Sequence, residues 1–452
     1  MKNEDQSYLY LILFHVVLGA MGFLLPFTAK IYGYSIFIFG VYYIIKKQNR
    51  NNEALIAAAY VVGSEVFLRM TGGNPLYEIS KYGVMVFILI GMYYSGFSKG
   101  AVPYWIFLLL LVPSVVISAF VLNFDTDIRK AIAFNISGPL CLGLASLYTF
   151  RRKIALEEIN RILLSMGLPI ITCMVYLTFY TPNVQEVITG TESNFQTSGG
   201  YGPNQVATVL GLGMFIFFSR VILDSKTKFQ IILNLIIALN ITYRGMLTFS
   251  RGGMITGFLM IVLLLVFLYF KSNFGGRVKL NYIIVLLVFA LFTTWTYTSF
   301  QTGGLINKRY SNQDAAGRVK QSQFTGREDV AQNEINTFLK NPIFGVGVGK
   351  GAEVREDETG IKVLSHDEIT RMLAEHGSLG IVALLILFFT PLVLYLENKF
   401  NMFLVCFVAF WFLTINHAAM RTAAPAFVYS LSLLNVQLGF PRKKRVGEEE
   451  RI

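Results

Sequence analysis

The segment LSHDEITRMLAEHGSLGIVALLILFF, residues 364–389, joins a polar stretch to an uninterrupted apolar one. In the polar part, Ser365 followed three residues later by Glu368 matches a capping box, and Gly377 is a common helix terminator. Positions 369, 372, 373 and 376 recur at helical spacing on one face, and charged residues line another. We therefore predict a short amphipathic helix at the membrane–water interface on the outer side, followed by a membrane-spanning helix.

Apolar runs like the one that ends this segment recur along the chain. Hydrophobic residues make up 54% of the 452 residues and charged residues only 15%, whereas soluble domains are about a quarter charged. Runs of roughly 17–22 apolar residues can cross the hydrocarbon core, where only helices or closed barrels satisfy the backbone, and barrel-type alternation is absent from this sequence. The runs lie at about residues 7–27, 31–46, 53–70, 77–97, 102–122, 129–150, 161–181, 202–222, 228–247, 252–271, 280–300, 378–397, 400–418 and 421–438.

These runs predict an all-α integral membrane protein, a polytopic bundle of about 12–14 transmembrane helices with one large extracytoplasmic loop. If the N-terminus is cytoplasmic, Lys and Arg concentrate in the inner loops, in agreement with the positive-inside rule. This orientation leaves a large loop at 301–377, and a second at about 182–201, on the periplasmic side. We expect residues 1–452 to form a single polytopic membrane domain whose 301–377 loop carries part of an active site.

The formal net charge is +12. In a soluble protein such a charge would indicate nucleic acid, but here it agrees with basic helix flanks and with anionic lipid or an anionic substrate. No nucleic-acid partner is therefore expected. The cysteines form no disulfide framework or zinc spacing, and no metal or cofactor is expected; all three lie inside apolar runs, at Cys141, Cys173 and Cys406.

One acidic pattern allows two interpretations. Asp125-Thr126-Asp127 has the DxD spacing with which some glycosyltransferases bind a divalent metal. Alternatively, Asp127 caps the next helix, with Lys130 at its N3 position. Arg129 lies at the outer mouth of that helix, where it could help to bind an anion.

The stretch LTFSRGGMITGF, residues 247–258, places Arg251 at the outer end of a predicted span. Gly253 and Gly257 have the GxxxG spacing that allows close helix packing. Arg251 either extends to the membrane interface or binds a diphosphate through its planar donor fork, and Arg244, seven residues earlier, could share its surroundings.

The large loop contains a predicted helix at about 327–340 that begins with Arg327 and ends before Pro342. The following GVGVGKG, residues 345–351, has the wrong spacing for a phosphate-binding P-loop, and we expect a flexible turn. Asn204, at the start of an earlier span, either hydrogen-bonds a substrate or caps its helix.

Three further features concern the histidines and the buried charges. Glu65 and Arg69, four residues apart in a span, are expected to pair, and His15 is expected to be a satisfied core residue. His417 and Arg421, also four apart, lie near an outer boundary and are weaker candidates for a site.

His366 falls at the start of the amphipathic helix predicted from the opening segment. There the helix dipole favours a neutral imidazole, which a general base requires, although neighbouring carboxylates oppose this effect. The alternative is an incidental histidine on a solvated helix face.

Taken in order, several of these motifs resemble the O-antigen ligase and polymerase superfamily. The resemblance covers about residues 200–380 and comprises GPNQVA, SRGG, GRE followed by a helix and NPIFGVGVG, and SHDEITRMLAEHGSLGI. The last motif is typically a histidine, a Leu-rich stretch and Glu-x-Gly-x-x-Gly; here it reads as His366, Leu373, Glu375, Gly377 and Gly380. The residue after the histidine is often Asn in the family, and here it is Asp367.

The resemblance implies a metal-independent, inverting glycosyltransferase of the bacterial cytoplasmic (inner) membrane, similar to GT-C-type enzymes, with its active site on the periplasmic side. The implied donor is a glycan on undecaprenyl diphosphate, and the acceptor is a sugar hydroxyl of a glycan or of lipid A-core. The family's essential residues map to Arg251, Arg327 and His366 as catalytic groups. Glu375 would orient His366 or bind sugar hydroxyls if the segment bends, and Arg244, Asn204 and Arg129 are further candidates for substrate binding.

Two alternatives remain open at this point. A ligase and a polymerase share this chemistry and differ in the acceptor, and we lean towards a ligase. A lipid-linked oligosaccharide flippase is the other alternative, although no internal repeat is visible and the polar candidates gather on one side.

Overall fold

The computed structural model describes residues 3–123, 125–320, 327–360, 363–399 and 401–437. Every predicted apolar run contains a helix. Ten helices within the described ranges are long and apolar enough to cross a membrane. They are α1 (Asn3–Leu24), α2 (Phe27–Lys47), α5 (Val102–Val121), α6 (Ile128–Thr149), α7 (Leu156–Tyr180), α9 (Pro203–Leu223), α10 (Lys228–Leu247), α11 (Arg251–Lys271), α12 (Phe274–Gln301) and α16 (Glu368–Glu397).

The four remaining runs form helices that are shorter or more charged. These are α3 (Glu53–Met70), α4 (Ile79–Ser95), α17 (Leu404–Ile415) and α18 (Ala423–Leu431). α3 contains three charged residues and is almost entirely buried in the bundle. The predicted fold class, an all-α polytopic membrane protein, is therefore confirmed.

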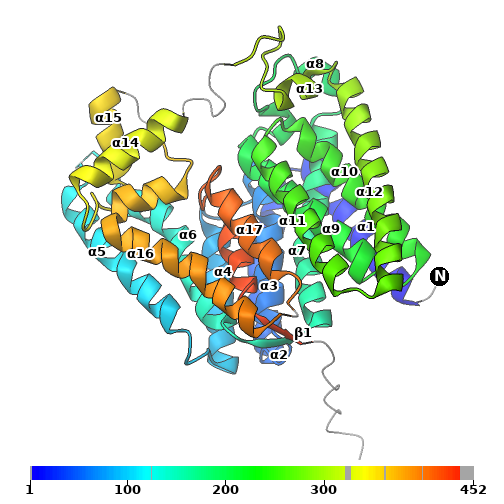
Figure 1. The fold of residues 1–452 in the computed structure, drawn as a ribbon, viewed down its shortest axis with the longest axis horizontal. Helices are drawn as coiled ribbons and strands as arrows, with labels where there is room; N and C mark the ends of the chain where they lie inside the picture. Colours follow the sequence, from blue (N-terminus) through cyan, green and yellow to red (C-terminus); the bar gives the residue numbers. More distant parts are fainter. Residues whose placement is uncertain (1–2, 124, 321–326, 361–362, 400, 438–452) are drawn as a thin grey trace, which may run out of the picture.

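The short elements gather at the two ends of the bundle (Figure 1). At one end, which we call the large-loop end, lie α8 (Val184–Val187), η1 (Gln196–Ser198), α13 (Leu305–Tyr310), α14 (Arg327–Lys340) and α15 (Lys350–Thr359). At the other, which we call the basic end, the strands β1 (Lys153–Ala155) and β2 (Asn435–Gln437) pair in parallel. Arg152 also donates to the Gly96 carbonyl there at 2.7 Å. Loops predicted to share the inner side therefore lie together.

Helix α11 packs very closely against α9. A Cβ atom on Gly253 would lie 2.3 Å from the carbonyl carbon of Ala207, and one on Gly257 would lie 2.3 Å from the carbonyl oxygen of Gly211. No larger side chain fits without separating the two helices, so the predicted GxxxG contact is confirmed. This contact brings the start of α11 beside the start of α9.

Helix α16 changes direction at Gly377, as its sequence predicted. The backbone of Gly377 has φ 61° and ψ −141°, a conformation that is essentially limited to glycine. A Cβ atom there would lie 2.6 Å from the carbonyl group of Ile343. Residues 368–376 therefore form a separate helical segment, which leads into the membrane-spanning part of α16.

We expect Gly377→Ala to lower the melting temperature and the yield of folded protein strongly, because alanine combines a disfavoured backbone conformation with a steric clash. Gly360→Ala is the matched control: Gly360 has φ +70°, and no atom of the described residues beyond its chain neighbours lies within 4 Å of the place that a Cβ would take. Only the left-handed conformation should therefore cost stability there, about 1–2 kcal/mol. Thermal unfolding of the two purified variants checks this. Equal melting temperatures would contradict the steric argument.

Candidate active site

Most of the site residues predicted from sequence lie at the large-loop end, each at or beside a helix end. Asn204 is in the first turn of α9, Arg244 is in the last turn of α10, and Arg251 is the first residue of α11. His366 lies two residues before α16, and Arg129 is exposed in the first turn of α6. The fold thus brings residues from distant parts of the sequence to one end of the bundle.

Arg251 belongs to a polar group that links α9, α11 and α13. Its guanidinium Nη1 donates to the Arg309 carbonyl at 3.4 Å, and Arg309 Nε donates to the Phe249 carbonyl at 2.9 Å. Ser250 Oγ donates to Asn204 Oδ1 at 2.7 Å. Asn204 therefore holds the residue next to Arg251, while the N-cap position of α9 is taken by Gly202.

Tyr310 is a neighbour of Arg251, whereas Arg244 has a different partner. Burial raises the pKa of Tyr310 to about 12, although Arg251 and Arg309 lie close enough to act in the opposite direction. Arg244 is buried and donates through Nη1 to the Thr181 carbonyl at 3.2 Å, so it fixes the end of α7.

His366 lies in the irregular segment 363–367, which is held from several sides. Arg355 donates to the Val363 carbonyl through Nε at 3.1 Å and through Nη2 at 2.9 Å. Arg421 Nη2 donates to the Ser365 carbonyl. The imidazole of His366 is partly exposed.

The predicted capping box at Ser365 is wrong. Asp367 is the N-cap of α16, and its Oδ1 accepts from the Ile369 N–H at 2.8 Å. Glu368 does not complete the box, because its carboxylate pairs with Arg371 and also accepts from the Met420 N–H at 3.4 Å. Burial, together with the negative charges of two neighbouring glutamates, raises the pKa of Asp367 to about 6.

The charged face of the predicted amphipathic helix is not solvated, as the alternative interpretation of His366 had assumed. Glu368, Arg371 and Glu375 are 1%, 6% and 3% exposed and form a buried ionic cluster. Arg371 Nη1 lies 2.8 Å from Glu375 Oε2. Buried charges require such partners because they have lost their hydration. The residues that cover the cluster come from distant segments, so the helical pattern alone does not reveal the burial.

The glycine-rich segment 345–349 is a packed loop and not the flexible turn that we predicted. The N–H of Val346 donates to the Ala374 carbonyl at 2.9 Å, and that of Gly347 donates to the Glu375 carbonyl at 3.1 Å. The N–H of Gly349 donates to Glu375 Oε1 at 3.0 Å. Glu375 therefore uses both carboxylate oxygens to hold Arg371 and this loop together.

Helix α14 begins at Arg327 and ends at Lys340, as predicted. The side chain of Arg327 lies outside the described part of the chain. The helix is joined to the His366 segment through Glu334, whose Oε1 lies 2.8 Å from Arg355 Nη1 and whose Oε2 accepts from Ser365 Oγ at 3.1 Å. α14 thus supports the segment that carries His366.

Other local predictions are confirmed. Asp127 caps α6 by accepting from the Lys130 N–H at 3.1 Å. Arg69 pairs with Glu65 at 2.7 Å. His15 is buried in the core, with Nε2 3.0 Å from the Tyr60 hydroxyl oxygen.

The turn between α17 and α18, residues 416–422, contacts both parts of the candidate site. His417 lies against Gly252, so that a Cβ atom on this glycine would be 2.7 Å from the imidazole ring. Arg421, at the other end of the turn, donates to the Ser365 carbonyl beside His366. Sequence reasoning ranked these two residues low; their only signal was a pair of polar residues, four apart, at the edge of an apolar run.

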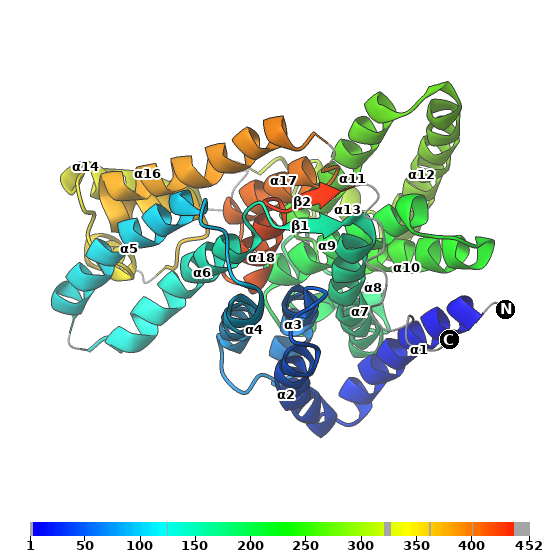
Figure 2. The ribbon, with the colours of Figure 1, turned by 90° about the horizontal axis from the view of Figure 1, so that it is seen from below.

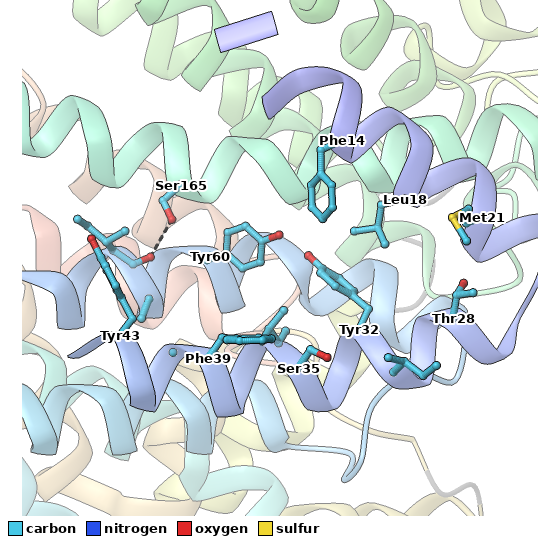
Figure 3. A pocket seen from close by; sticks show the side chains of 15 residues that line it. Phe14, Leu18, Met21, Thr28, Tyr32, Ser35, Phe39, Tyr43, Tyr60 and Ser165 are labelled. Atoms are coloured by element: carbon cyan, nitrogen blue, oxygen red, sulfur yellow. Dashed lines mark hydrogen bonds between the residues drawn. The ribbon is translucent and has the colours of Figure 1, made fainter. Parts of the chain in front are cut away.

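A cavity of about 650 Å³ lies apart from this polar site, between α1, α2, α3 and α7 (Figure 3). α1 and α2 diverge at this point (Figure 2). Aromatic and aliphatic side chains dominate the lining, and none of the lining residues is charged. The cavity suits a hydrocarbon chain and offers no cation for a phosphate. Five aromatic side chains that line the cavity are labelled in Figure 3: Phe14, Tyr32, Phe39, Tyr43 and Tyr60.

The fold and site together define a multi-pass membrane protein with a polar, arginine-containing site at one end of an apolar bundle. Residues 235–385 match the O-antigen ligase family, a stretch that runs from α10 into α16 and includes Arg251 and His366. This match supports the resemblance of the chain to the O-antigen ligase and polymerase superfamily. The match supports a role like that of a membrane glycosyltransferase. A comparison with curated proteins found no match.

Proposed function

We propose that the protein transfers a glycan from undecaprenyl diphosphate to a sugar hydroxyl at the large-loop end, which faces the periplasm. The observation that best supports this is the link between two polar groups at one end of the bundle. The 416–422 turn contacts Gly252, next to Arg251, and also the carbonyl next to His366. The concentration of Lys and Arg at the opposite end supports the orientation.

In the proposed reaction, the acceptor oxygen attacks the anomeric carbon from the side opposite the diphosphate. The carbon–oxygen bond to the diphosphate breaks, and the leaving group keeps the electron pair. His366 takes the proton of the acceptor hydroxyl as general base. The anomeric configuration is therefore inverted.

Charge stabilisation of the leaving diphosphate is assigned to Arg251 and Arg327. A planar guanidinium donates two parallel hydrogen bonds to phosphate oxygens and keeps its charge at any physiological pH. Because a diphosphate is already a good leaving group, it needs charge stabilisation more than it needs protonation. The proposal therefore requires no metal ion.

The remaining candidates have supporting roles in this proposal. Glu375 positions the loop and Arg371, Asn204 fixes Ser250, and Arg244 anchors the end of α7. Arg129 is exposed at the same end, where it can attract anionic headgroups. The apolar part of the donor would stay in the bilayer and approach the site sideways between helices.

The test is reconstitution of the purified protein in vesicles with defined undecaprenyl-diphosphate-linked glycans. Two acceptors are offered, lipid A-core and the donor itself, and we expect transfer to lipid A-core. Transfer to the donor alone would identify a polymerase with the same chemistry. Movement of the lipid-linked glycan between leaflets without transfer would contradict the proposal and indicate a flippase, and loss of activity with EDTA that magnesium restores would contradict metal independence.

A further inference from the structure

The turn formed by residues 416–422 occupies a central position in the bundle. Figures 1 and 2 both show α17 and α18 between the group of α5, α6 and α16 and the group of α9 and α11. The turn that joins them lies outside the stretch matched by the O-antigen ligase family. Its contacts reach both parts of the proposed site.

The backbone of the turn is anchored independently of the Arg421 side chain. Glu65 Oε2 accepts from the Ala423 N–H at 2.7 Å, and Arg69 Nη2 donates to the Arg421 carbonyl at 3.3 Å. On the opposite side, Met420 packs against α6 so tightly that a Cβ atom on Gly138 would lie 2.6 Å from its Cβ. A change in the Arg421 side chain should therefore leave the turn in place.

The Arg421 guanidinium has a defined place on the His366 side of the turn. It stacks over the Phe134 ring, 4.8 Å from the ring centroid, and donates to the Ser365 carbonyl. The segment 363–367 has no regular hydrogen-bonded structure of its own. Arg355 holds its first carbonyl and Arg421 holds the carbonyl immediately before His366.

We propose that Arg421 is a positioning residue for the transfer reaction: by holding the Ser365 carbonyl, it sets the place of the His366 imidazole relative to Arg251. This rests on the proposed function, in which His366 is the general base. The Ser365 carbonyl needs only one hydrogen-bond donor. The positioning role therefore requires a long cationic side chain at position 421, but not the two parallel N–H groups of a guanidinium. A displacement of a catalytic group by about 1 Å can cost about 100-fold in rate.

The experiment compares Arg421→Ala and Arg421→Lys in the full-length, reconstituted protein. We expect Arg421→Ala to lower kcat by roughly 10- to 100-fold with little change in the KM for the undecaprenyl-diphosphate donor. Arg421→Lys should recover most of kcat, because an ammonium group can donate to the same carbonyl. Melting temperatures confirm that each variant is folded.

Arg152→Ala is the matched control. Arg152 also stacks on an aromatic ring, 3.8 Å from the centroid of Tyr148, and donates to the Gly96 carbonyl at 2.7 Å, but it lies at the basic end. The Arg152→Ala variant should keep a near wild-type kcat even if it loses some stability. A comparable loss of kcat in Arg152→Ala would mean that the effect is general destabilisation, and would overturn the proposal.

Two further outcomes would overturn the positioning role. A folded Arg421→Ala with wild-type kcat would show that the Ser365 contact is dispensable, and a raised donor KM with unchanged kcat would make Arg421 a donor-binding group. His366→Ala separates this proposal from the proposed function. If His366→Ala keeps transfer, the general-base assignment fails; if His366→Ala loses transfer while Arg421→Ala keeps it, only the positioning role fails.

Discussion

Replacing His366 by alanine should reduce glycan transfer by roughly 10²–10⁴-fold, the range over which a general base contributes to catalysis. The protein should remain folded in the membrane, because the imidazole is partly exposed and the segment is held through backbone carbonyls and the Ser365 side chain. The KM for the donor should change little, since the base acts on the acceptor hydroxyl. Single-turnover transfer from a defined undecaprenyl-diphosphate donor measures the loss directly.

A matched histidine elsewhere in the chain provides the control. His15 is buried in α1, with Nδ1 2.8 Å from the Leu11 carbonyl oxygen and Nε2 close to the Tyr60 hydroxyl. His15→Gln keeps a polar side chain there and should retain transfer, whatever its effect on stability. Wild-type turnover in folded His366→Ala would rule out His366 as the base.

Replacing Arg251 by alanine should have the second largest effect, a loss of roughly 10²–10³-fold in kcat, as found when a preorganised donor to a developing charge is removed. Arg251 is at the first position of α11, beside the closely packed glycines, so its backbone is fixed by the contact with α9. The guanidinium can therefore lose its function without loss of the helix. Transfer rates at saturating donor, together with melting temperatures, separate the two effects.

Lysine at position 251 should restore little of the activity, because an ammonium group keeps the charge but cannot donate two parallel hydrogen bonds to a diphosphate. This result would distinguish Arg251 from Arg421, for which lysine should suffice. Arg152→Lys, at the basic end, controls for the general effect of an arginine-to-lysine change. Recovery of near wild-type rates in Arg251→Lys would show that charge alone is needed and would remove the argument from fork geometry.

Local features of the chain were predictable because their causes lie within a few residues. The helix at 327–340, the cap at Asp127 and the break at Gly377 depend on spacing, capping and the conformational freedom of glycine. The Glu65–Arg69 pair follows from a separation of one helical turn. The same local signals failed at Ser365, where Glu368 has partners from its own helix and from the 416–422 turn.

The errors at the candidate site share a physical cause. Residues 345–349 look flexible because they are rich in glycine, but three of their N–H groups donate to the carbonyls of Ala374 and Glu375 and to the Glu375 carboxylate, 26 to 28 residues further on. The charged face of residues 368–376 looks solvated, but α6, the 416–422 turn and the packed loop contact it. In both cases the deciding partner is outside the local sequence window.

The sequence by itself determined that this is a membrane protein and where its long helices lie, because a backbone in lipid must satisfy its own hydrogen bonds within long apolar runs. It also predicted that the polar candidates share one side of the membrane. Only the tertiary structure decided which helix ends meet, which charges are buried and that the 416–422 turn joins the surroundings of Arg251 to those of His366. The contacts that the 416–422 turn makes with Gly252 and with Ser365 join residues more than fifty positions apart. They depend on close packing between helices and on the partners that buried charges require, neither of which can be read from spacing along the chain.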